Sequence, residues 1–304
     1  MPSQIDRRAF AAGLLAASVA TPAVAQVPRD ELIEQRESRY NTIYVTREGG
    51  YIGMKFGVNR RLFSESLYNP REPRELPYAY TQYMTAVLAY PAQANSILEI
   101  GLGGGRTANY LHLHMQQARI TCVELDPVVI ELAQRYFGVR PDNRLQLVAR
   151  DGRLFLRQTP DTYDIIMVDA YRGTFVPFHL LTREFFQIVK RKLKPGGACA
   201  QNIESSAMLY DAAIATLRSV FANVDLYNAD GNVVAIAYDG PAKTAEQLRA
   251  RAQAVQSAYN LRYPIPGMLS RRRPATGRVT GRVLTDDFAP VESLRAIERH
   301  NEKR

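Results

Sequence analysis

The feature that most constrains this chain is the segment 96–105, where a short apolar run ends in a cluster of glycines. Gly101, Gly103 and Gly105 occupy alternate positions, and residues 106–111 then have the character of a helix. Glycines allow a tight turn and leave no side chain between the main chain and a ligand. A strand that runs at once into such a turn and a helix is typical of nucleotide-binding α/β domains. The glycines alone are a weak signal, so the strands that follow must carry the argument.

From residue 96 to residue 238 the chain alternates between strand-like and helix-like segments. Such alternation predicts a parallel sheet with helices on both faces, closed here by an antiparallel hairpin around Asp230-Gly231. We therefore expect an α/β protein with a Rossmann-like, mostly parallel sheet of seven strands. The expected strands are 96–100, 119–124, 145–149, 164–168, 197–203, 222–227 and 232–238, and the expected helices are 105–116, 127–136, 152–158, 181–193 and 206–220.

A small antiparallel β unit is expected before this sheet. Residues 39–66 alternate between polar and apolar side chains around a Gly49-Gly50 turn, which is a hairpin signature. Residues 27–37 are charged and predict either a short helix or a tether. Further helices are expected at 78–89 and 243–258, and a Pro- and Arg-rich loop over 263–282. The expected divisions are an export signal (1–25), a tether with the β unit (26–77), a nucleotide-binding domain (78–240) and a C-terminal helix, loop and tail (241–304).

The first 25 residues have the features of a twin-arginine export signal. Arg7-Arg8 precede a mildly apolar run, and Ala23-Val24-Ala25 offers small residues for cleavage before Gln26. The apolar run is too short to span a membrane. We expect a periplasmic or otherwise exported protein without membrane contact. The alternative is an N-terminal extension on a cytoplasmic protein.

Charge and cysteine content narrow the function classes. Lys and Arg number 39 against 30 Asp and Glu, but they are spread along the chain, which favours a solvated basic surface over nucleic-acid binding. The Arg-rich stretch 271–273 offers an alternative, a patch for an anionic lipid or polyanion.

Cys122 and Cys199 lie in strand-like runs and predict buried thiols rather than a disulfide. The four histidines show no ligand spacing, so no metal site is expected.

Acidic residues recur along the expected strands, toward the edge where an open α/β sheet binds its ligands. Glu99 lies in the first strand, and Glu124 ends the second, where a ribose diol would be held. Asp151, followed by Gly152, ends the third and is either an acceptor for an adenine amino group or a helix cap. Asp169 ends the fourth, where a general base or a substrate anchor belongs. Acidic residues on four successive strands together predict a nucleotide-type ligand. No Gly-Lys-Ser/Thr sequence follows the glycines, which argues against phosphoryl transfer.

Several motifs together resemble those of spermidine synthases over roughly residues 36–240. They are the segments 37–45, 97–105, 123–126, 150–152, 163–169 and 194–197, with Gln201 after the last. The resemblance implies a fold of the S-adenosylmethionine-dependent methyltransferase type with an added β domain. It also implies a transferase of polyamine biosynthesis. Enzymes of this family move an aminopropyl group from decarboxylated S-adenosylmethionine to a diamine.

Carried over by position, the resemblance implies a role for each matching residue. Asp169 would be the base that accepts a proton from the attacking amine, and Tyr80 would match a tyrosine that lines the substrate. The co-substrate would be decarboxylated S-adenosylmethionine or S-adenosylmethionine, and the acceptor a small-molecule amine or other nucleophile. Homodimers are common in the family. The cofactor-binding positions would be Glu99, Gly101, Gly103, Gly105, Glu124, Asp151 and Gly152.

The chain departs from the family pattern at three places. Spermidine synthases usually have an Asp that holds the donor's propylamine where this chain has Gly104. A second Asp helps to hold the diamine where this chain has Arg172, and a glutamine expected near residues 60–64 is missing. A cation in place of a carboxylate at ~4 Å weakens the binding of a dication by several kcal/mol. The usual diamine pose is therefore not expected.

The segments 169–173 and 284–292 instead resemble a divergent, spermidine-synthase-like branch of the family. Its candidate substrate residues are Tyr171, Arg172, His179 and Asp287. Asp286 or Asp287 would equally serve to cap or tether the tail. We expect alkyl transfer from a sulfonium donor, with aminopropyl transfer first and methyl transfer second. The alternative from another class is an exported nucleoside-binding protein without turnover, since such a donor is not expected outside the cytoplasm.

Overall fold

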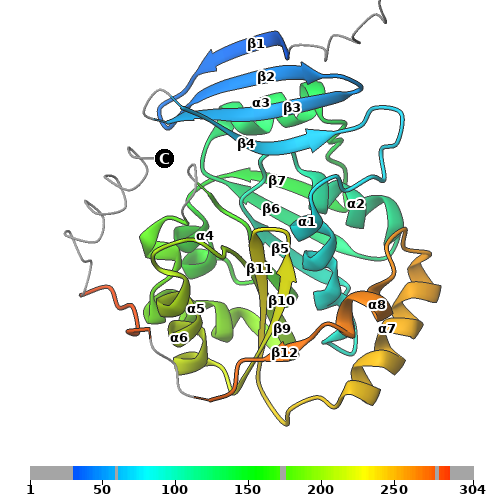
Figure 1. Cartoon of the computed structure of the whole chain (residues 1–304), viewed down its shortest axis with the longest axis vertical. Coiled ribbons are helices and arrows are strands. Elements are labelled where there is room, and N and C mark those ends of the chain that lie inside the picture. Colours follow the sequence, from blue (N-terminus) through cyan, green and yellow to red (C-terminus); the bar gives the residue numbers. More distant parts are fainter. Residues whose placement is uncertain (1–29, 59–60, 172–175, 278–280, 288–304) are drawn as a thin grey trace, which may run out of the picture.

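Two β-sheets, one small and one large, organise the described part of the chain (Figure 1). The computed structural model describes residues 30–58, 61–171, 176–277 and 281–287. The predicted export signal and Arg172 lie outside these ranges. The expected architecture, a small antiparallel sheet before a mostly parallel Rossmann-like sheet, is confirmed.

The small sheet is antiparallel and packs on one helix of the larger unit. Its strands follow chain order, β1 (Glu31–Glu37), β2 (Thr42–Glu48), β3 (Tyr51–Val58) and β4 (Arg61–Tyr68). Alternate side chains of β2 and β3, among them Ile43 and Met54, point to one face and are buried. They pack against Leu132 and Phe137 at helix α3 (Pro127–Tyr136). This contact holds the small sheet over one edge of the large one.

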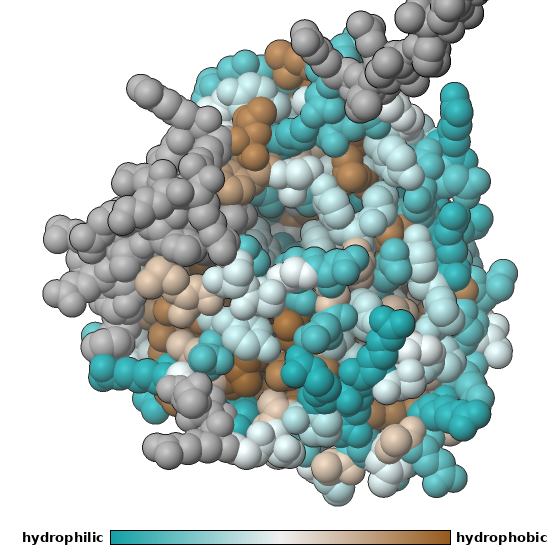
Figure 2. Space-filling model, in the orientation of Figure 1, coloured by the Kyte–Doolittle hydropathy of each residue, from teal (hydrophilic) through white to brown (hydrophobic). Residues whose placement is uncertain are grey.

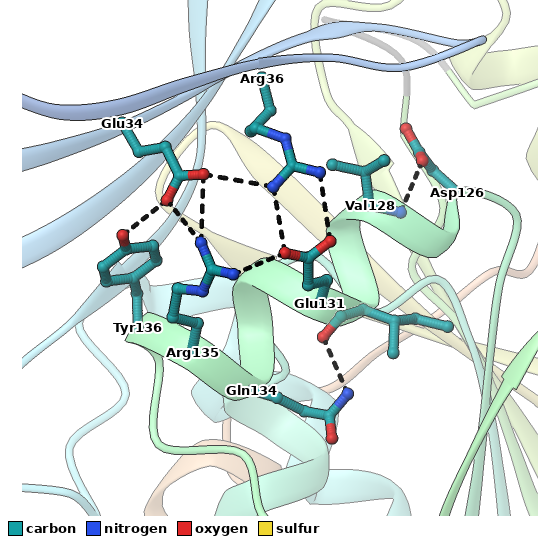
Figure 3. A network of polar contacts seen from close by, with 9 residues as sticks. Glu34, Arg36, Asp126, Val128, Glu131, Gln134, Arg135 and Tyr136 are labelled. Carbon is teal, nitrogen blue, oxygen red and sulfur yellow. Dashed lines mark hydrogen bonds and ion pairs between the residues drawn. The ribbon is translucent and has the colours of Figure 1, made fainter.

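Strand β1 corrects the expectation of a helix or tether over 27–37. Its side chains are mostly charged, and no apolar alternation marks it as a strand. It pairs with β2, and its charges meet those of α3 in a network (Figure 3). Arg36 Nη1 lies 3.0 Å from Glu131 Oε1, and Arg135 Nη1 lies 3.1 Å from Glu34 Oε2. The strand is therefore selected by contacts distant in the sequence, which local charge patterning cannot reveal.

The large sheet has the order β12-β10-β11-β9-β8-β5-β6-β7. The strands from β9 to β7 in this order are parallel, while β11, β10 and the two-residue β12 are antiparallel additions. Seven strands were expected, and β12 is the eighth. The bounds are β5 (Ser96–Ile100), β6 (Arg119–Glu124), β7 (Leu145–Ala149), β8 (Tyr163–Val168), β9 (Leu193–Glu204), β10 (Asn223–Ala229), β11 (Asn232–Tyr238) and β12 (Arg273–Pro274).

Helices cover both faces of this sheet, so its central strands are buried on both sides. Successive residues of β5 show this, since Ile97 packs in one core and Leu98 in the other. On the first face lie α1 (Ala79–Met84), the 3-10 helix η1 (Thr85–Ala89), α2 (Arg106–His114), α7 (Ala245–Tyr259) and α8 (Ile265–Leu269). On the second lie α4 (Gly152–Gln158), the 3-10 helix η2 (Phe178–Leu180), α5 (Arg183–Lys192) and α6 (Tyr210–Val220).

The outer surface shown in Figure 2 is largely hydrophilic, with apolar side chains in small groups between polar ones. Within the described ranges, no helix is both long and apolar enough to cross a membrane.

The segment 263–282, expected to be a loop, also needs correction, because it contains α8 and β12. Its Arg-rich stretch is partly structural. Arg272 Nε lies 2.7 Å from the buried Asp225 Oδ2, which also accepts a hydrogen bond of 2.8 Å from Tyr90. Arg272 further donates to the carbonyl of Lys243, at 2.7 Å. One arginine of the stretch therefore neutralises a carboxylate inside the fold, while Arg271 is exposed.

Replacing Arg272 with Met should destabilise the protein by about 3–5 kcal/mol, because it leaves the buried Asp225 carboxylate without its cation. Urea unfolding measures this free energy. The matched control is Arg271→Met, which should change it by less than about 0.5 kcal/mol. Equal losses in the two variants would contradict the structural role given to Arg272.

Candidate active site

A cavity of about 530 Å³ lies between the small sheet and the carboxyl ends of the parallel strands. Its floor includes the glycine loop after β5 and the residues that end β6, β7 and β8. Its roof comes from the β1–β2 connection and from β4. The cavity therefore stands where open α/β sheets bind ligands, and the small sheet closes it.

The glycine loop after β5 lies directly against the backbone that follows β8. Gly101 has a φ of +93°, and a Cβ built on it would lie 2.2 Å from the carbonyl oxygen of Asp169. No side chain fits there, and Asp169 N–H in turn donates to the carbonyl of Ile100, at 2.8 Å. Gly103 also lines the cavity with a positive φ, whereas Gly105 caps α2 and is not among the cavity residues.

Most backbone N–H groups of this loop already have acceptors within the protein. Leu102 N–H donates to Glu124 Oε2 at 2.9 Å, and Gly104 N–H donates to Ser66 Oγ at 2.8 Å. Gly101 and Gly105 N–H donate to backbone carbonyls, so four of the five N–H groups of residues 101–105 have an acceptor. A loop whose donors are mostly satisfied in this way is not a cradle for a phosphate or a carboxylate.

The space beside Gly104 is filled by the small sheet and by the end of α3. A Cβ at this position would lie 2.7 Å from Phe137 Cδ1 and 2.8 Å from Ser66 Cβ. The Asp that spermidine synthases usually carry here would therefore collide with both residues. The departure seen in the sequence thus fits the close packing at this position.

Glu124, at the end of β6, is held beneath the cavity by backbone donors. Burial raises the pKa of its carboxyl, and the N–H groups of Asp126 and Leu102 partly offset that rise. Asp126 itself caps α3 by accepting from Val128 N–H at 2.9 Å, and its second oxygen bonds the hydroxyl of Ser38. Both carboxylates line the cavity, beside Leu125.

Asp151 caps a helix, which is one of the two roles left open by the sequence, and it also lines the cavity, while its role as an adenine acceptor stays a prediction. One oxygen accepts from Leu154 N–H at 2.8 Å, and the other lies 2.9 Å from His179 Nε2. The contact with His179 lowers the pKa of the Asp151 carboxyl. The next residue, Gly152, packs so closely on Ile100 that a Cβ would lie 2.3 Å from its Cγ2.

Asp169 lies at the centre of the cavity floor, between the glycine loop and β9. Burial raises the pKa of its carboxyl to about 6, against the lowering effect of a hydrogen bond from Asn202. That bond joins Asn202 Nδ2 to Asp169 Oδ1 at 2.9 Å. A carboxylate with this pKa is ionised at neutral pH and still basic enough to accept a proton.

Two tyrosines predicted from the sequence flank Asp169. Tyr80, from α1, and Tyr171, from the segment after β8, both line the cavity. Burial, followed by the charge of Asp169, raises the pKa of each phenol well above its usual range, so both are neutral hydroxyls. They present aromatic walls to anything that approaches the carboxylate.

Two other predicted residues lie outside this cavity. Glu99 is buried below the glycine loop, where burial and Asp169 raise the pKa of its carboxyl and Cys122 Sγ lies 3.7 Å away. Asp287 is exposed and does not line the cavity, so the expectation that it reaches the crevice needs correction. Its neighbour Asp286 pairs with Arg153, at 2.8 Å between Oδ1 and Nη1, and tethers the tail.

Sequence reasoning missed two walls of the cavity. One is the small sheet, whose residues here include Asn41, with a buried Oδ1 that has no hydrogen-bond partner within the described ranges. Nothing in the sequence near residue 41 marks this placement, which depends on packing. The other wall is the end of β9, where Asn202 and Glu204 could have been found by applying the strand-end rule to the fifth parallel strand. Glu65, from β4, completes the acidic lining.

Within the described ranges, no group of three or more His, Cys, Asp or Glu could hold a metal ion.

Comparisons with known proteins agree with this geometry. The family model described as spermine/spermidine synthase domain matches residues 78–230. A polyamine aminopropyltransferase of Vibrio vulnificus is 29% identical over 283 residues, which are 88% of this chain and 93% of that protein. A polyamine aminopropyltransferase of Chromobacterium violaceum is 30% identical over 198 residues, 63% of this chain and 76% of that protein.

Solved structures share the fold. A probable spermidine synthase from Corynebacterium glutamicum has a TM-score of 0.65 at 20% identity and covers 85% of this chain and 98% of its own. Human methyltransferase-like protein 13, solved with SAH, has a TM-score of 0.56 at 23% identity and covers 71% of this chain and 99% of its own. With the family model matched across the glycine loop and all four parallel strand ends of the cavity, the chain belongs to the spermine/spermidine synthase family.

Proposed function

We propose that this protein transfers an aminopropyl group from a decarboxylated S-adenosylmethionine-type sulfonium to an amine, with Asp169 as the base. One observation carries the proposal: the cavity combines a carboxylate lining with a glycine loop in which most backbone donors are already occupied. Asp169, Glu124, Asp151, Glu65 and Glu204 all line it. Such a site favours a nucleoside whose tail is cationic.

The donor's tail distinguishes the two transfer reactions. S-adenosylmethionine ends in an ammonium and a carboxylate, whereas its decarboxylated form ends in an ammonium alone. Beside the loop, a carboxylate would find the N–H of Gly104 bonded to Ser66 and that of Leu102 bonded to Glu124. It would also face the acidic lining, which repels it. An ammonium needs no N–H donor from the loop, and the acidic lining attracts it.

The chemistry is a displacement at carbon. The neutral nitrogen of the acceptor attacks the carbon next to sulfur, a C–N bond forms as the C–S bond breaks, and the electron pair leaves with sulfur as a thioether. The new ammonium gives a proton to Asp169. Because a sulfonium is already a good leaving group, the protein's contribution is to position the amine, exclude water and hold the proton acceptor.

The residues around Asp169 suit an amine acceptor. Tyr80 and Tyr171 keep neutral hydroxyls, so the phenols add no negative charge beside the Asp169 carboxylate. Their rings supply apolar walls for an alkyl chain. This lining supports a small amine as the acceptor, and the homologous enzymes are themselves named for acting on polyamines.

Methyl transfer from S-adenosylmethionine is the second candidate, favoured by the fold shared with a human methyltransferase-like protein solved with SAH. A third is an exported nucleoside-binding protein without turnover. It follows from the twin-arginine motif at Arg7-Arg8, which lies outside the described residues. Export through this motif remains part of the proposal, and fractionation of cells that express the full chain tests it.

Calorimetric titration of the full chain should show tighter binding of decarboxylated S-adenosylmethionine than of S-adenosylmethionine, by ~10-fold or more, about 1.4 kcal/mol. Methylthioadenosine, which lacks the charged tail, serves as the control for the nucleoside part. A preference for S-adenosylmethionine would favour methyl transfer. Failure of all three to bind would remove the transferase proposal and leave an exported protein with a different ligand.

Asp169→Asn should lower kcat by about 10²–10⁴-fold, because the amide cannot accept the proton. In the unmodified protein kcat should fall as the pH drops through about 6, because protonation removes the carboxylate form and the raised pKa places that loss near neutrality. Stopped assays with decarboxylated donor and a saturating diamine measure both. The exposed Asp161→Asn is the control and should leave kcat unchanged. A flat profile from pH 5 to 8 would remove Asp169 as the base.

A further inference from the structure

Two asparagines form a hydrogen-bonded chain that ends on Asp169. Asn202 lies on β9 and is 1% exposed, and its Nδ2 donates to Asp169 Oδ1 at 2.9 Å. Its Oδ1 accepts from Asn232 Nδ2, at 3.0 Å. Asn232 begins β11, directly after the turn at Asp230-Gly231, and lies beside the cavity with Asn202.

The order of donors and acceptors in this chain is fixed by the chemistry of the amide. An asparagine side chain donates through one atom and accepts through the other. Because Asn232 donates to the oxygen of Asn202, the nitrogen of Asn202 faces Asp169. A rotation of the Asn202 amide by half a turn would place two donors together at Asn232 and an oxygen against the carboxylate.

We propose that Asn202 and Asn232 are positioning residues for Asp169, which orient its carboxylate and hold it in the proton-accepting form. This inference rests on the proposed function. The bond to Asn202 occupies Oδ1 and restricts rotation of the carboxylate, so that the acceptor's proton passes to Oδ2. A buried amide that donates to a carboxylate stabilises the charged form relative to the protonated one.

Of the other groups near Asp169, the phenols are neutral and the carboxyl groups act in the opposite direction, while the cation Arg106 acts in the same direction as Asn202. Tyr80 and Tyr171 are uncharged, and Glu99 below the loop has its own carboxyl pKa raised by burial and by Asp169. Glu65 and Arg106 line the small pocket that Asp169 shares with Tyr80. The Asn202 amide is the side chain that donates a hydrogen bond to Asp169 within the described residues. Its loss should therefore be visible in the titration of this carboxyl.

The test follows the Asp169 carboxyl itself, by carboxyl-carbon NMR of aspartate-labelled full-length protein, with the signal assigned through Asp169→Asn. Asn202→Leu, of similar size but without a donor, should raise the pKa of Asp169. Asn232→Leu should raise it by less, because the Asn202 amide remains but is no longer oriented. In the double variant the Asn232 change should add nothing, since its effect passes through Asn202. The matched control is Asn223→Leu, on β10 of the same hairpin, where the side chain bonds Gly240 and does not reach the site.

An unchanged Asp169 titration in both single variants overturns the proposal, and so does an equal shift in Asn223→Leu. Should Asn202→Leu fail to fold, Asn232→Leu alone decides, because its side chain is only partly buried. If aminopropyl transfer is observed, a rise of one unit in the pKa of Asp169 in Asn202→Leu should lower kcat about fivefold at pH 6 and much less at pH 9, because the ionised fraction falls from about one half to about one eleventh at pH 6. The NMR result holds whether or not turnover is found, so failure of the positioning role and failure of the proposed function are told apart.

Discussion

The contact between Gly101 and the backbone of Asp169 is the constraint on which the rest of the site depends. The two chains approach so closely that any side chain at residue 101 would overlap the carbonyl of Asp169, and one backbone hydrogen bond from Asp169 to Ile100 ties them. This approach sets the glycine loop and the candidate base at a fixed separation. It also places Asp169 in the sheet's crevice, where burial raises the pKa of its carboxyl to about 6.

The small sheet then turns an open crevice into an enclosed, acidic cavity. Ser66 occupies the donor of Gly104 and fills the space that a side chain there would need, and Ser38 bonds the helix cap Asp126. Both serines come from a unit whose own stability depends on packing against α3. Changes in the small sheet can therefore alter ligand preference without touching the parallel strands. This is a physical route by which members of one family can diverge in the donors and acceptors that they accept.

Much of the large sheet could be predicted from the sequence, because each of its parallel strands contains an apolar run and is followed by a helix. The carboxylates Glu124, Asp151 and Asp169 could be placed at one edge by topology alone, since parallel strands end together. Strand β1 could not be predicted, because its side chains are charged and form ion pairs with α3, nearly a hundred residues further along the chain. Asp287 could not be placed from the sequence either: it is exposed and does not line the cavity, and its neighbour Asp286 is the residue that pairs with Arg153.

The Asn202–Asn232 chain shows what kind of site residue escapes sequence reasoning. Neither amide is charged. The strand-end rule could place Asn202 at the edge of the sheet, and Asn232 follows the turn glycine Gly231, but neither signal shows that the two side chains meet. Their importance arises from the register between β9 and β11, which places Asn202 opposite Val234 and leaves Asn232 beside it at the end of the strand. A shift of β11 by one residue along β9 would turn Asn232 to the other face of the sheet and leave the Asn202 amide without the donor that orients it. The pairing of β9 with β11 is therefore part of what orients the candidate base.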